Sequence, residues 1–364
     1  MKFQGMAGSS LGQVLARRDN PEGLDFLCSC ETFKREGLAI KSWLTSTEIV
    51  TGYGIASVFT PSHNRKKGYA AHMMRLLHWV LAPRSALPDT FPVELWGEMP
   101  SRDLWRAAGL KAIPEGHGED ATFSTLWSDI GNSFYTNCGP IPSEQGCVVR
   151  DPISTDWRVE SLFSLLNSRP NGIESTSWVW LDEKDACEIW KLDAEKMKDE
   201  MEALARDTDT KNDDTALFTF LPYKGVAEFQ VDRLRHFWGK VKPLPNCWGV
   251  YRQASNESRL DPSTFATWTL DVRPGQANDL IITRLRARPE DFAPLMKEVV
   301  GHAKRHGVEK IEVWGLAKEL RDIIGGRTWV RDEHLSSFKW YGREENVKWC
   351  FNENAPRVPS ADFA

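Results

Sequence analysis

The stretch GIASVFTPSHNRKKGYAAHMMRLLHWVL, residues 54–81, predicts a strand, a turn and a helix in immediate succession. Residues 54–60 are mostly apolar and are stopped by Pro61, a pattern typical of a buried strand. From Ala70 onward, apolar residues recur at i, i+3, i+4, i+7 and i+11, which puts them on one face of a helix. Pro83 ends this run, so the helix is expected to stop just before it.

The turn between the strand and the helix has the residue types of an anion-binding site. Unpaired N–H groups at the start of a helix, together with the helix dipole, attract phosphate groups. A glycine lets the backbone approach a ligand closely, an alanine keeps the first turn thin, and basic side chains add positive charge. On these residues alone, an ordinary solvated turn is an equal alternative. The turn consists of Arg65, Lys66, Lys67, Gly68, Tyr69 and Ala70.

Length and composition limit the classes to which the protein can belong. The 364 residues exceed two typical domains of ~150 residues, and 41% hydrophobic with 27% charged residues indicates globular domains with packed cores. The net charge of -5 disfavours general binding of nucleic acid. No apolar run reaches the ~18 residues of a membrane span and no signal core is present, so we expect a cytoplasmic protein with no membrane partner.

The second half repeats the order of elements expected in the first half. Around residues 140–151 the composition shifts to Pro, Gly and polar residues, which predicts a domain of residues 1–145 followed by one of residues 146–364. Both halves read as strands, then a helix, then a strand and a short helix, which favours a duplicated fold. Besides residues 54–81, the expected elements of the first half are strands 11–17, 24–33 and 121–127 and a short helix 129–138. Those of the second half are helices 184–206, 291–306 and 316–324 and strands 247–253, 265–272, 280–287 and 310–314.

Histidine and cysteine spacing does not predict a metal site or a cysteine nucleophile. Cys28 and Cys30 lie two apart on an expected strand, which is typical of two reduced core thiols. The histidines His63, His72 and His78 have no ligand spacing with carboxylates, so we interpret them as surface or core residues.

A second motif follows a later strand. Phe134-Tyr135-x-x-x-Gly139, taken with Arg65-x-x-Gly-x-Ala70, resembles the acyl-CoA-binding core of the GNAT N-acetyltransferase superfamily. Longer stretches at 28–32, 54–61, 68–77 and 127–135 resemble the fungal lysine N6-acetyltransferase family. The resemblance implies an α/β (α+β mixed sheet) fold, in which a GNAT acyltransferase domain precedes a GNAT-like domain that lacks the pyrophosphate loop. The run Arg286-Ala287-Arg288-Pro289-Glu290 fits that second domain.

The same resemblance implies a reaction. We expect an acetyl-CoA-dependent N-acetyltransferase that acts on the ε-amine of L-lysine or a similar small amine, with acetyl-CoA as acyl donor and no metal. A polyamine, a secondary metabolite or a protein lysine are alternative acceptors, and a non-catalytic CoA-binding relic is the alternative outside enzymes. The oligomeric state is not predicted.

Donor binding and catalysis are assigned to particular residues. The pyrophosphate is expected on Arg65–Ala70, and the backbone at Ser57, Val58 and Phe59 is expected to polarise the thioester. Glu31, near the end of a central strand, is the candidate base, although an ion pair with a neighbouring basic residue is the alternative. The resemblance places Tyr135 near the sulfur as the proton donor, with a packing role as the alternative.

The closing segment is expected to touch the acceptor. Trp340 and Tyr341 would form an aromatic wall and Glu353 would bind an ammonium group, although a terminal strand completing a sheet is the preferred alternative. Two departures from the GNAT pattern are visible: few residues precede Leu11, and Pro140 stands where an aromatic residue is usual. We expect the short start to weaken acceptor recognition more than cofactor recognition.

Overall fold

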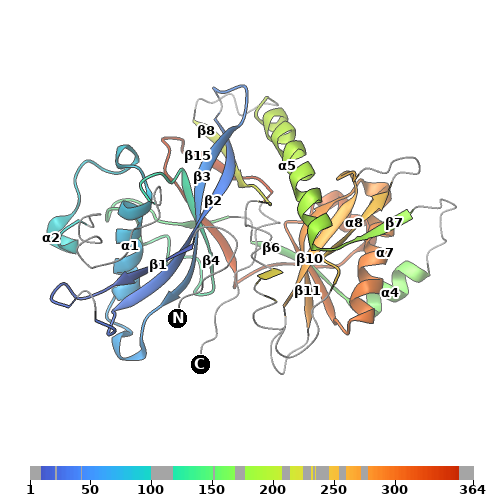
Figure 1. Cartoon of the computed structure of the whole chain (residues 1–364), viewed down its shortest axis with the longest axis horizontal. Coiled ribbons are helices and arrows are strands. Elements are labelled where there is room, and N and C mark those ends of the chain that lie inside the picture. The colour runs from blue at the N-terminus through green and yellow to red at the C-terminus, as the bar shows by residue number, and fades with distance from the viewer. Residues whose placement is uncertain are drawn as a thin grey trace.

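The computed structural model shows a mixed α/β architecture with two separate sheets (Figure 1). In the part of the chain that it describes, no helix is both long and apolar enough to cross a bilayer. The described residues are 10–20, 23–41, 43–99, 118–150, 152–168, 177–206, 214–223, 231–232, 234, 246–253, 260–271 and 278–351.

The first sheet is built on two long antiparallel strands, β2 (Cys28–Lys41) and β3 (Glu48–Phe59). Its strand order is β15-β8-β2-β3-β4-β14-β5, and β1 pairs with the free part of β2. Three of these strands, β8, β14 and β15, come from the second half of the chain, so sheet membership does not follow chain order. The division at residue 145 therefore stays a prediction. The remaining strands are β1 (Ser10–Leu15), β4 (Phe123–Ser128), β5 (Val148–Val149), β8 (Thr215–Phe220), β14 (Leu335–Trp340) and β15 (Asn346–Trp349).

This sheet curls around buried aromatic side chains. The ring of Trp349 on β15 lies 6.3 Å from the ring of Phe338 on β14 and 5.8 Å from that of Trp127 on β4. In a flat sheet β15 and β14 would lie roughly 24 Å apart, at ~4.8 Å per strand. The contact therefore requires a strongly curved sheet. We call the enclosed group the aromatic cluster; it contains Phe123, Phe218, Phe220, Phe338, Trp340 and Trp349, with Trp127 packed against it.

Helix α1 (Tyr69–Leu81) covers the other side of β2 and β3. It buries Met73, Met74 and Leu77 against strand residues that include Cys28 and Cys30, both of which are free, buried thiols. The helix expected from the apolar spacing is confirmed. Short helical turns η1 (Ser62–Asn64), η2 (Arg84–Ala86) and α2 (Val93–Trp96) precede and follow it.

The second sheet has the order β13-β6-β12-β11-β10-β9-β7. Helices α4 (Val159–Asn167), α5 (Glu183–Arg206), α7 (Pro289–Arg305) and α8 (Lys318–Ile324) accompany it, and α5 also contacts β2 of the first sheet (Figure 1). Its strands are β6 (Ile153–Arg158), β7 (Ser177–Leu181), β9 (Gly249–Gln253), β10 (Phe265–Asp271), β11 (Asp279–Arg286), β12 (Lys310–Trp314) and β13 (Arg327–Val330).

Both sheets contain the same strand–helix–strand unit. Strands β3 and β4 are parallel and are joined through α1, and strands β11 and β12 are parallel and are joined through α7. Antiparallel β2 and β10 flank the two units in the same way. The connection into α1 spans residues 60–68, whereas the connection into α7 is residues 287–288. The second unit therefore repeats the first with a much shorter connection into its helix, as expected from the sequence.

Some expected element boundaries were wrong. Residues 129–138 form turns rather than a short helix. The strand expected at 24–33 runs from Cys28 to Lys41. It continues through the charged residues Lys34 and Arg35 because each has a partner. Lys34 pairs with Asp120, and the Arg35 guanidinium lies 5.3 Å from the ring centre of Phe33.

Candidate active site

Strands β3 and β4 part beyond Gly54. Their parallel pairing is limited to Gly52–Gly54 with Phe123–Thr125, although both strands continue. The register between β3 and β2 shifts beside Ser57, whose φ of 53° marks a bulge. Bulges bend a strand and increase its twist, which separates β3 from β4. The β4-facing edge of Ile55–Phe59 is therefore left without ladder partners in β4, and a wedge opens between the two strands.

The turn before α1 leaves the helix start uncapped. Gly68 is the N-cap residue with φ 81°, and no side chain caps the helix. No acidic residue lies in the first turn, and a Cβ at Gly68 would meet no atom within 4 Å. The first N–H groups of a helix need partners from outside it. Open backbone, an uncapped dipole and the exposed Lys66 therefore fit an anionic group at this turn.

The turn is held in place by its own polar side chains. Arg65 donates from Nε to the Thr60 carbonyl oxygen at 3.1 Å, and Lys67 Nζ lies 3.5 Å from Asn64 Oδ1. Asn64 is buried, and its Nδ2 donates to the Phe26 carbonyl oxygen at 3.2 Å. Asn64 was not predicted to belong to the site, because nothing in the sequence of a polar turn indicates that its single asparagine is buried.

Glu31 lies directly beside the bulge. The Ser57 hydroxyl donates to Glu31 Oε2 at 2.6 Å, so two residues predicted separately are in contact. Both are accessible to solvent. The basic neighbours considered for an ion pair with Glu31 have other contacts, since Lys34 pairs with Asp120 and Arg35 stacks on Phe33.

Tyr135 lies on the opposite face of β2 from Glu31. It packs with Val58, Tyr69 and Ala70 against the cluster that contains Cys30. Neighbouring strand residues point to opposite faces, so Glu31 points away from that cluster. Burial raises the pKa of the Tyr135 phenol above its usual value, and the nearby Cys147 and Asp129 add to the effect. The phenol therefore stays protonated at neutral pH.

The predicted acceptor residues lie inside the protein. Trp340 is buried in the aromatic cluster, and its Nε1 donates to Glu344 Oε2 at 2.7 Å. Tyr341 lies on the α1 side of the sheet, where its hydroxyl is 2.8 Å from His78 Nδ1 and 3.1 Å from Ser124 Oγ. The structure thus brings Trp340 and Tyr341 to opposite faces. Glu353 lies outside the described residues.

His78 is a fully partnered core residue. Its Nε2 donates to the Cys138 carbonyl oxygen at 2.9 Å, so Nδ1 accepts the hydrogen bond from Tyr341. Burial is the main cause that lowers the pKa of His78 to about 3. The neutral imidazole links α1 to Tyr341 and to the Cys138 carbonyl, so His78 is a core residue. Among the residues placed by the structure, no group of three or more His, Cys, Asp and Glu side chains is arranged to hold a metal ion.

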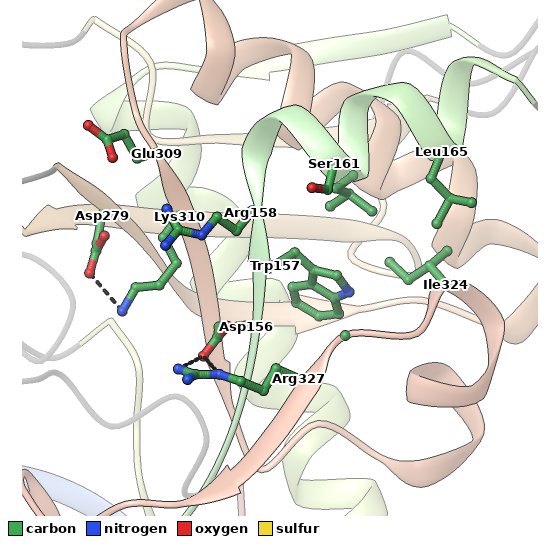
Figure 2. Close-up of a pocket in the computed structure, with 12 residues that line it drawn as sticks. Asp156, Trp157, Arg158, Ser161, Leu165, Asp279, Glu309, Lys310, Ile324 and Arg327 are labelled. Carbon is green, nitrogen blue, oxygen red and sulfur yellow. Dashed lines mark hydrogen bonds and ion pairs between the residues drawn. The ribbon is translucent and has the colours of Figure 1, made fainter.

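A pocket of about 620 Å³ lies elsewhere, in the second sheet beside α4 and α8. Figure 2 shows its two ion pairs, Arg327 with Asp156 at 2.7 Å and Lys310 with Asp279 at 2.8 Å. Trp157 lies between these charges and an apolar end formed by Leu165 and other residues (Figure 2). None of the residues assigned to donor or acceptor lines this pocket.

Three solved structures resemble the chain at low similarity. A GCN5-related N-acetyltransferase from Kribbella flavida is 12% identical with a TM-score of 0.43; the match covers 87% of this chain and 58% of that one. A probable N-acyltransferase from Enterococcus faecalis V583 is 10% identical with a TM-score of 0.45, covering 87% and 60%. A GCN5-related N-acetyltransferase from Anabaena variabilis is 10% identical with a TM-score of 0.43, covering 92% and 73%.

The chain therefore spans less than two thirds of the length of the first two of these structures. No curated protein matches the chain. One family model matches residues 164–357, and its description is the LYC1 GNAT-like C-terminal domain. This match covers more than half of the 364 residues. The chain thus belongs to the family described as the LYC1 GNAT-like C-terminal domain.

Proposed function

We propose that the protein is an acetyl-CoA-dependent N-acetyltransferase that modifies the ε-amine of free L-lysine or a similar small amine. The observation that carries the proposal is the wedge beyond Gly54, which opens next to the uncapped start of α1. Membership of the family supports an acyltransferase function in general. The resemblance to fungal lysine N6-acetyltransferases supplies the acceptor. A cytoplasmic location remains a prediction from the sequence.

The donor would bind along β3 and the turn. The backbone N–H groups at the start of α1, with Arg65, Lys66 and Lys67, would hold the pyrophosphate. The unpaired edge at Val58 and Phe59 would accept the pantetheine arm as an added strand does, through backbone hydrogen bonds. Gly68 must remain without a side chain, because the phosphate and the backbone meet there.

Glu31 would remove the proton that blocks attack. A lysine ε-ammonium has a pKa of about 10.4, so at pH 7 only roughly one amine in a few thousand is neutral. The Glu31 carboxylate, oriented by the Ser57 hydroxyl, lies at the bulge where the thioester would sit, and it would accept the proton directly or through water. The neutral nitrogen then forms a bond to the thioester carbon.

Tyr135 would complete the transfer from the other face. As the carbon–sulfur bond breaks, the leaving thiolate takes the phenolic proton, and the second proton of the attacking nitrogen passes through water to the phenolate. The products are the amide and the free thiol, with Tyr135 protonated again. The phenol is protonated over the whole neutral range because burial raises its pKa. The wedge connects the two faces of the sheet, so a base on one face and an acid on the other would act on one thioester.

Mass spectrometry of products tests the proposal. The full chain is incubated with acetyl-CoA and L-lysine, spermidine or a lysine-containing peptide, and thiol release is followed in parallel. We expect N6-acetyl-lysine with one CoA released per product, and no release by the Gly68→Asp variant. Release with spermidine or peptide alone would reassign the acceptor. Binding of CoA without turnover of any amine would identify a non-catalytic protein.

A further inference from the structure

Two polar atoms of β4 are buried and have no hydrogen-bond partner among the residues that the structure describes. They are Oγ1 of Thr125, whose residue is 0% exposed, and the indole Nε1 of Trp127. Leaving such a group unpaired in a protein interior costs about 1–3 kcal/mol. Trp268 Nε1 and Thr269 Oγ1 on β10 of the second sheet are unpaired as well, so the two atoms of β4 point to a ligand only together with open space beside them.

Both residues lie at the mouth of the wedge. Thr125 is the last residue of β4 that pairs with β3, and its partner is Gly54, which in turn pairs with Phe33. Register partners share a face of the sheet, and residues two apart on a strand do as well. Thr125, Trp127 and Gly54 thus face the side of the sheet on which Glu31 lies.

Strand β3, which lies between β2 and β4, leaves open space on this face of the sheet. A Cβ at Gly54 would meet only the Phe33 Cβ, at 3.9 Å. At Gly52, one step further from the wedge, an added Cβ would overlap the ring of Phe123. On this face of the sheet, the Phe123 ring therefore fills the space above Gly52, whereas the space above Gly54, the register partner of Thr125, is open.

We propose that Thr125 and Trp127 form the acceptor subsite, an inference that rests on the proposed acetyl transfer. The Thr125 hydroxyl oxygen accepts a hydrogen bond from the attacking amine, on the same face of the sheet as the carboxylate of Glu31. The Trp127 indole N–H can only donate, so it selects an acceptor molecule that also carries a carboxylate or carbonyl oxygen. The rings of Trp127 and Trp349, with centres 5.8 Å apart and planes inclined by 57°, would contact the aliphatic chain of the acceptor.

This subsite favours amino acids with a side-chain amine over polyamines, since a polyamine has no oxygen to accept from Trp127. L-Lysine and cadaverine, which is lysine without its carboxylate, are therefore the matched pair of probes. The two variants are Thr125→Val, which keeps the shape, and Trp127→Phe, which removes the N–H. The control is Thr155→Val in the second sheet, where the hydroxyl is satisfied by Thr328 at 3.3 Å.

For Thr125→Val we expect KM to rise about 10-fold for both amines, with KM for acetyl-CoA unchanged. Its melting temperature should stay equal or rise, because an unpaired buried hydroxyl has been removed. For Trp127→Phe we expect KM to rise about 10-fold for L-lysine and to stay unchanged for cadaverine. Thr155→Val should lower the melting temperature and leave both KM values as in the wild type.

Wild-type KM values for both amines in Thr125→Val would overturn the subsite while leaving the acetyl transfer intact. A wild-type ratio of KM for cadaverine to KM for L-lysine near one would overturn the role of Trp127, even if Trp127→Phe does not fold. No thiol release by the wild type with either amine would overturn both the proposed function and the subsite.

Discussion

The two strand–helix junctions of this protein share a topology and differ in charge. The first junction, from β3 into α1, has an open glycine at the N-cap and no acidic residue in the first helical turn. The second, from β11 into α7, places Pro289 at the helix start and Asp291 in the first turn. Asp291 is buried and accepts from Arg252, from Thr264 Oγ1 at 3.2 Å and from Arg288 Nε at 3.1 Å. The second helix thus carries its own anion.

The corresponding gap of the second unit is also filled by charged residues of the protein. The pairing of β11 with β12 ends at Ile282, and of the arginines that follow on β11, Arg284 is buried and Arg286 is partly buried. Arg284 donates from Nε to Asp193 Oδ2 at 2.6 Å, and Arg286 pairs with Asp193 and Glu200, all supplied by α5. The second unit thus occupies both places with carboxylates of its own, whereas the first turn of α1 holds none.

The largest expected effect comes from Gly68→Asp. Aspartate tolerates the left-handed backbone better than most residues, but it places a negative charge on the anion site, so CoA affinity should fall by more than about 100-fold. Titration calorimetry on the folded variant measures this. Arg288→Ala changes the N-cap of α7 and should leave CoA affinity unchanged. Unchanged affinity in Gly68→Asp would remove the contrast between the junctions.

Tyr135→Phe should lower kcat by roughly 10²- to 10⁴-fold with little change in KM for acetyl-CoA. The cause is loss of the proton donor to the thiolate. Tyr251→Phe is the matched control, because the pKa of that phenol is also raised by burial but it lies in the second sheet. A thiol-release assay that gives wild-type kcat for Tyr135→Phe would assign this residue to packing.

Asp193→Asn tests the ion pairs that fill the gap of the second unit. The change leaves Arg284 and Arg286 short of a buried countercharge, and we expect the free energy of unfolding to fall by about 3 kcal/mol. Urea titration measures the loss. CoA affinity of the folded fraction should be unaffected, and a weaker affinity would mean that the wedge and this gap are coupled.

The smallest expected effect is on the pH dependence of stability, through one buried histidine on α1 and one on α7. Burial lowers the pKa of His78 on α1 to about 3 and that of His302 on α7 to about 4. The unfolded chain takes up these protons near pH 6.5, so stability falls with decreasing pH, by about 1.4 kcal/mol per pH unit for each group. His302 Nε2 has no hydrogen-bond partner, whereas both nitrogens of His78 do.

Replacing each histidine by phenylalanine separates the two cases. His302→Phe should be neutral or stabilising at pH 7 and should reduce the slope of stability with pH between 6.5 and 4. His78→Phe should destabilise at pH 7 by about 1–3 kcal/mol, because it leaves the Cys138 carbonyl and the Tyr341 hydroxyl short of a partner. Chemical denaturation across this pH range tests both, and equal slopes for all three proteins would refute the assignment.

Local patterns predicted the parts of the fold that depend on local sequence. Helix α1, the long helix α5 and the order β10, β11, α7, β12 followed from apolar spacing, and the open turn followed from its residue types. The closing segment was expected to be a terminal strand that completes a sheet, and β14 and β15 confirm this, but their place in the first sheet was not predicted. Strand β8 was missed, because pairing with a distant edge leaves no trace in neighbouring residues. The partner of Glu31 was missed for a related reason: a bulge at Ser57 depends on the register between strands.

The placement of β14 has a consequence for how the protein is made. Strand β4 needs β14 as its outer neighbour, but β14 follows roughly 200 residues later in the chain. A ribosome adding ~5–20 residues per second needs roughly 10–40 s to supply it. During that interval the nascent chain exposes an unpaired edge of apolar residues, a surface that promotes association between chains. Translation speed and chaperone capture should therefore decide the yield of this protein more than its final stability does.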